Sequence, residues 1–92
     1  MTEVEEVFAD QLTRWRQESW MTLKEHLKDP VAYELEGESG TTYQFELVVF
    51  WDGPRGGDLR AIFTGDDGKG WRWRGMRTDD FIKAPDDSFV DE

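Results

Sequence analysis

Apolar residues in the first third of the chain recur at spacings of three, four and eight, which places them on one face of an α-helix. The stripe consists of Val4, Phe8, Leu12, Trp15, Leu23 and Leu27. Thr2 and Glu5 have the spacing of a capping box at a helix start. Pro30 disfavours the helical conformation for the residue before it. The pattern therefore predicts one continuous helix over residues 2–28, with Trp20 at the edge of the stripe.

From residue 31 onward the pattern changes to alternation of apolar and polar residues, which is the period of a β-strand. Glycine-rich turns separate the alternating runs. The predicted strands are residues 31–36, 41–52, 58–64 and 71–77. Residues 78–84 extend the last strand or form a short fifth element.

These elements predict an α+β fold, a two-layer sandwich in which one long N-terminal helix packs on a four-stranded antiparallel meander. We assign residues 1–84 to a single domain and residues 85–92 to an acidic C-terminal tail. The predicted helix-facing core of the sheet consists of Tyr33, Phe45, Leu47, Val49, Leu59, Phe63, Trp71 and Trp73.

The run Trp-Arg-Trp-Arg at residues 71–74 splits between the two faces of a strand, because successive side chains point to opposite sides. With the tryptophans under the helix, the arginines lie on the outer face of the sheet beside Val48 and residues of the neighbouring strands. The candidate binding residues on this face are Phe50, Arg60, Ile62, Arg72 and Arg74. Arginines around apolar side chains are typical of a protein interface.

Three occupants of this outer face are open from the sequence. The acidic C-terminal segment with Phe81, Phe89 and Val90 can fold back over it and pair Asp79, Asp80, Asp86 or Asp87 with the arginines. A protein partner, including a second copy of the chain, can bind there. A small molecule or a nucleic acid is the third option, and alternation counts against nucleic acid because it separates the stacking rings from the phosphate-binding arginines.

The net charge of the chain limits the classes of partner that it is expected to bind. The chain has 21 acidic and 11 basic residues and a net charge of −10, which argues against nucleic-acid binding and against anionic membranes. Residues 1–54 carry a net −8, residues 55–77 a net +3 and residues 78–92 a net −5. Adaptation of a whole proteome to high salt explains the bulk acidity equally well.

Catalytic and metal-binding signatures are missing from the sequence. There is no cysteine and one histidine, His26, so no thiol nucleophile, zinc site or histidine-based triad is predicted. We expect no enzymatic activity, no cofactor and no metal. The absence of cysteine and the acidic N-terminus, which does not resemble a signal peptide, predict a cytoplasmic protein without membrane attachment.

The functional expectation is a non-enzymatic module that binds a protein partner, or forms a homodimer, through the outer sheet face. One alternative is an acidic regulator that occupies a basic, nucleic-acid-binding surface as a decoy. The other is a small-ligand domain with a pocket between helix and sheet.

Overall fold

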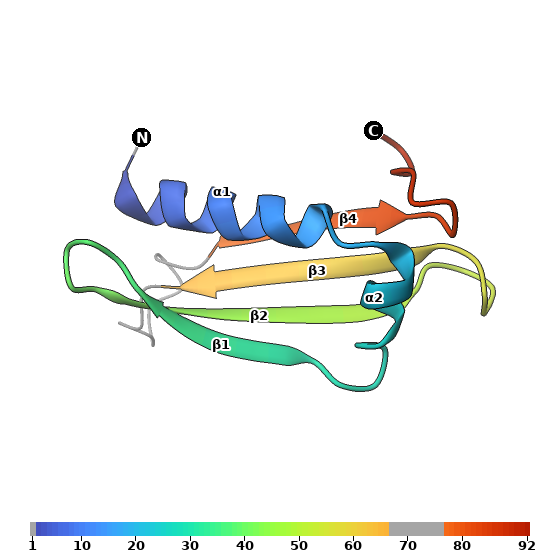
Figure 1. The fold of residues 1–92 in the computed structure, drawn as a ribbon, viewed down its shortest axis with the longest axis horizontal. Coiled ribbons are helices and arrows are strands. Elements are labelled where there is room, and N and C mark those ends of the chain that lie inside the picture. The colour runs from blue at the N-terminus through green and yellow to red at the C-terminus, as the bar shows by residue number, and fades with distance from the viewer. Residues whose placement is uncertain (1, 67–76) are drawn as a thin grey trace.

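The computed structural model describes residues 2–66 and 77–92 and shows two layers, helices on one side and an antiparallel sheet on the other (Figure 1). The helices are α1 (Glu3–Arg16) and α2 (Trp20–Lys24). The strands are β1 (Val31–Glu36), β2 (Thr42–Trp51), β3 (Leu59–Asp66) and β4 (Arg77–Lys83). Strand order in the sheet is β1-β2-β3-β4, with every neighbouring pair antiparallel. The predicted α+β meander is confirmed.

The core lies between the helices and the sheet face toward them. Five of the predicted core residues are buried there, namely Phe45, Leu47, Val49, Leu59 and Phe63. The rings of Phe45 and Phe63 stack with centroids 5.4 Å apart, and Phe8 of α1 packs on Phe63 at 5.2 Å. Tyr33 is partly buried beside them. Trp71 and Trp73 lie outside the described residues.

The prediction of one helix over residues 2–28 is wrong, because the chain breaks between α1 and α2. Ser19 has an extended backbone and caps α2 by accepting a hydrogen bond from the Thr22 N–H at 3.1 Å. The break turns α2 toward the end of the sheet, where Leu23 is fully buried and Trp20 is 8% exposed. The Trp20 indole donates to the Gly57 carbonyl at 2.9 Å, so Trp20 belongs to the core rather than to its edge.

The groups that stabilise this break come from the far end of the chain. The buried Lys83 ammonium donates to the carbonyls of Arg16 and Glu18, each at 2.6 Å, and so satisfies acceptors that a helix end leaves unpaired. The Asp87 carboxylate accepts the Trp20 N–H at 2.7 Å at the start of α2. Tertiary contacts thus stabilise the break together with the local Ser19 cap.

The last strand of the sheet is β4, Arg77–Lys83, which covers the segment predicted to extend the fourth strand or to form a short fifth element. The helix-facing residues of β4 are not all apolar. Arg77 and Lys83 face the helices because their side chains bond to them. Arg77 pairs with Glu5 of α1 at 3.5 Å, and Lys83 bonds the α1–α2 junction. Phe81 is the buried aromatic residue of the strand. The sequence pattern at 71–77 lies outside the described residues except for Arg77.

Candidate functional site

The candidate site is the outer face of the sheet, the face turned away from α1 and α2 (Figure 1). At the end where β2 finishes, it carries an apolar cluster of Val48, Phe50, Ile62 and Ile82 around Arg60. Phe50 is 39% exposed, and Val48 and Ile62 are half-buried. Phe50 also borders a hollow of about 400 Å³ together with Lys24, Leu27, Lys28 and Arg55. The register therefore brings together Phe50, Arg60 and Ile62, three of the five predicted site residues.

Arg60 is held by two carboxylates. Its Nε donates to Asp52 Oδ1 at 3.0 Å, and its Nη1 donates to Asp80 on β4. The hydrogen bond to Asp52 is the main cause that raises the pKa of Arg60 above its usual value, against a smaller effect of desolvation. Arg60 is consequently an organised part of the surface whose positive charge is already balanced by its neighbours.

The other two predicted site residues, Arg72 and Arg74, lie outside the described residues.

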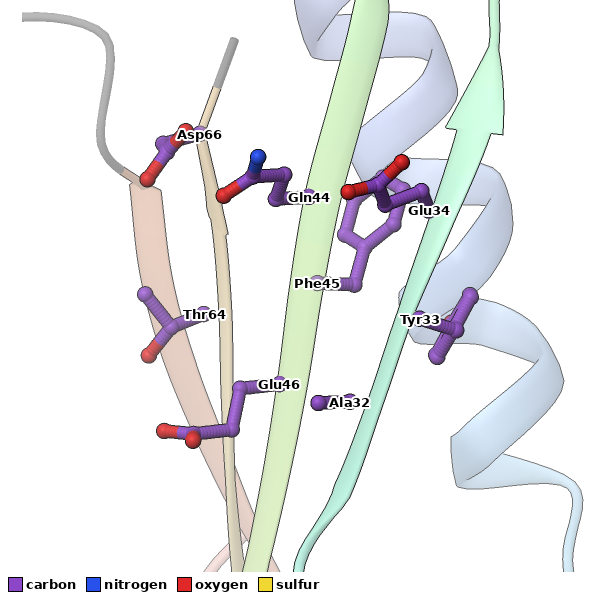
Figure 2. A pocket seen from close by; sticks show the side chains of 8 residues that line it. All are labelled: Ala32, Tyr33, Glu34, Gln44, Phe45, Glu46, Thr64 and Asp66. Carbon is purple, nitrogen blue, oxygen red and sulfur yellow. The ribbon is translucent and has the colours of Figure 1, made fainter. Parts of the chain in front are cut away.

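The opposite end of the outer face is acidic and slightly hollow (Figure 2). Glu34, Gln44 and Asp66 form one row across β1, β2 and β3. The next row consists of Ala32, Glu46 and Thr64. An open hollow of about 440 Å³ lies over these rows. The sequence analysis missed this cluster because its carboxylates come from three separate strands.

The C-terminal segment packs on the helix side and along the β4 edge, where Val90 donates to the Ile82 carbonyl. Asp87 caps α2 on the helix side, and the Phe89 ring packs edge-on against Phe81 with the Arg16 guanidinium 4.3 Å above it. Asp86 accepts hydrogen bonds from Ser88, which lower the pKa of that carboxyl group. Of the four acidic residues expected to meet the arginines, the structure pairs Asp80 with Arg60.

A further hollow of about 560 Å³ lies between α1 and β1, where the sequence suggested a ligand pocket. Three of the side chains that line it bond to one another. Trp15 donates to the Tyr33 hydroxyl at 3.0 Å, and Tyr33 donates to Gln11 at 2.8 Å. Burial is the main cause that raises the pKa of Tyr33, so its hydroxyl stays protonated as a donor. These groups give no specific support to a ligand.

Comparison with known protein families, curated proteins and solved structures finds no match to this chain. Within residues 2–66 and 77–92, no three histidine or carboxylate side chains are grouped so that they could hold a metal ion. The helices in the same ranges are too short or too polar to cross a membrane.

Proposed function

We propose that the protein is a non-enzymatic interaction module whose outer sheet face binds a partner protein carrying apolar and basic side chains. The observation that carries the proposal is Phe50, which is 39% exposed in a cluster with half-buried Val48 and Ile62 on the sheet face turned away from the helices. Exposed apolar clusters with a polar rim are characteristic of protein-binding surfaces.

Charge decides the kind of partner. The cation at the centre of the cluster, Arg60, is already paired with two carboxylates. Beyond the cluster the same face presents Glu34, Glu36 and Glu46, all exposed. These carboxylates attract basic side chains of a partner, and Lys24, Lys28 and Arg55 beside Phe50 restrict that attraction to the Glu34 end of the face. A partner of this kind also fits the decoy alternative, in which the protein occupies the basic, nucleic-acid-binding surface of another molecule.

The same charges weigh against a homodimer through this face. A two-fold interface brings each patch against its own copy. Carboxylates such as Glu34 and Glu46 would then approach carboxylates of the same face. The cytoplasmic location predicted from the absence of cysteine is part of this proposal, because a reducing compartment suits a chain without disulfides.

Site-specific photo-crosslinking in cells tests the proposal. Benzoylphenylalanine replaces Phe50 in one variant and Met21, which is 66% exposed on α2, in a matched control. We expect a partner protein to crosslink at position 50 and not at position 21. With that partner purified, Phe50→Asp should weaken binding by at least about tenfold, as expected for a central interface residue. Added salt should weaken it further.

The control variant Met21→Asp should leave the affinity unchanged. Equal crosslinking at both positions, or unaltered binding by Phe50→Asp, contradicts the proposal. A crosslink between two copies of the chain would support a homodimer in place of a different partner. Sedimentation at two protein concentrations then tests for the dimer.

A further inference from the structure

The outer edge of β1 presents backbone groups that have no partner among the described residues. The Gly37 N–H donates to the Thr41 carbonyl at 2.8 Å, which continues the β1–β2 register by one pair. Hydrogen-bonded pairs alternate along an antiparallel ladder. The odd-numbered residues of β1 therefore bond to β2. The N–H and C=O groups of Ala32, Glu34 and Glu36 point away from it, and no hydrogen bond within residues 2–66 and 77–92 reaches them.

The side chains along the β1 edge indicate which residue types an added strand would need. On the outer face it would lie beside Glu34 and Glu36, with Glu46 on the next strand. On the helix-side face it would meet Leu35, which is 37% exposed, and the partly buried Tyr33. Successive side chains of a strand alternate between the two faces. The edge therefore suits a segment that alternates basic and apolar residues.

Ala32 adds room on the outer face. It is the smallest side chain in its row and lies under the hollow bordered by Glu34 and Glu46 (Figure 2). A long basic side chain that reaches over Ala32 from an added strand would lie between these two carboxylates. Opposite charges on neighbouring strands stabilise their pairing, and like charges oppose it.

We propose that the β1 edge binds an extended segment of a partner protein by adding it as a further strand, with basic residues toward Glu34 and Glu36 and apolar residues toward Leu35. Main-chain hydrogen bonds then supply affinity, and the alternating side chains supply specificity. A second copy of β1 is a poorer occupant, because it would place the same glutamates opposite one another. The inference shares the basic partner of the proposed function but does not use Phe50, so the Phe50→Asp variant and the peptide tests at β1 distinguish the failure of one from the failure of the other.

Synthetic peptides provide the probe. The first peptide has about seven residues, a typical strand length, alternates lysine and valine, and carries blocked ends. The second has the same sequence with N-methyl groups on alternate amides, so that it keeps its charge but cannot form a ladder. Nuclear magnetic resonance of the full chain should show slowed amide exchange at Ala32, Glu34 and Glu36 with the first peptide. We expect the second to bind at least about tenfold more weakly.

Charge reversal at the edge is the matched test in the protein. Glu34→Lys with Glu36→Lys should weaken binding of the first peptide by about tenfold, since attraction becomes repulsion at both positions. Glu6→Lys with Glu25→Lys makes the same change in net charge at exposed helix-side positions and should have a much smaller effect. Circular dichroism shows whether each variant keeps the fold.

Equal binding of the two peptides would overturn the inference, because attraction would then be electrostatic without strand addition. Equal weakening by the two charge reversals would overturn it as well. Protection of the β1 amides in the protein alone, with dimers in sedimentation, would assign the edge to a second copy instead of a partner.

Discussion

The two edge strands of the sheet, β4 and β1, differ in the hydrogen bonding of their outward backbone groups. At β4 the segment after the strand returns along it. Val90 donates to the Ile82 carbonyl at 2.9 Å, and Ala84 donates to Ser88 at 2.8 Å. The Asp79 side chain accepts the Asp80 N–H at 2.8 Å. At β1 the corresponding outward groups have no partner within the described residues.

The β4 edge is therefore the stabilising one, and the β1 edge is the one accessible to a further strand. An unpaired strand edge is a template for pairing with another chain, and natural proteins usually block it. The segment that blocks the β4 edge also bonds to the helices, since Asp87 within it accepts the Trp20 N–H. At β1 the exposed carboxylates deter a second acidic copy but attract a basic strand. We therefore expect perturbations at β4 to change stability and perturbations at β1 to change binding.

The largest expected effect follows from Lys83→Met. The substitution keeps an unbranched chain over the Phe89 ring but leaves the carbonyls of Arg16 and Glu18 without their donor. We expect the free energy of unfolding to fall by about 2 kcal/mol. The fall is smaller than the loss of two hydrogen bonds to a charged group would give by itself, because Lys83→Met also removes the cost of burying the ammonium. That desolvation is also the main cause that lowers the pKa of Lys83. Urea denaturation measures the loss.

Lys28→Met at an exposed position is the control, and it should change stability by less than about 0.5 kcal/mol. A Lys83→Met variant as stable as the unmodified protein would mean that burying the ammonium costs as much as its two bonds contribute. The β4 edge would then be held by the Phe89 contact instead.

A smaller effect is expected at Asp87, whose backbone has a positive φ of 73°. Glycine and asparagine both tolerate this conformation. Asp87→Gly removes the acceptor of the Trp20 N–H, whereas Asp87→Asn keeps an oxygen that can accept it. Asp87→Gly should lose about 1 kcal/mol, as for a lost helix cap, and Asp87→Asn should lose much less. Equal thermal denaturation of the two variants would show that the cap contributes nothing.

The smallest effect is a pH dependence confined to the closed edge. Hydrogen bonds from Arg16 lower the pKa of Glu92, and those from Ser88 lower the pKa of Asp86. A lowered carboxyl pKa contributes stability above the unfolded-state value and loses it as the pH falls through the folded-state value. Residues 84–92 should therefore loosen below about pH 4. Backbone relaxation measurements should show new motion in residues 86–92 before any appears in β1; simultaneous loosening of both edges contradicts this.

Much of the fold could be predicted from local pattern. Alternation in residues 31–36 and 41–52 identified two strands and the faces of their side chains, because the period of a strand is set by covalent geometry. The same rule placed Phe50, Arg60 and Ile62 together on the outer face. The acidic hollow could not be predicted, because Glu34, Glu46 and Asp66 become neighbours only through the register of three strands.

The sequence by itself determined the α+β class, the meander and the apolar positions of the core, since these depend on periods of a few residues. Only the tertiary structure decided which groups hold the break between α1 and α2 and which polar residues of β4 bond to the helices. Both depend on bonds between distant residues, such as Lys83 with Glu18 and Arg77 with Glu5. The contrast between a closed and an open edge has the same origin. A backbone hydrogen bond leaves no mark on the residue types that form it. The folded chain alone therefore shows the bond at the Ile82 carbonyl and the lack of a partner for the Glu34 backbone among the described residues.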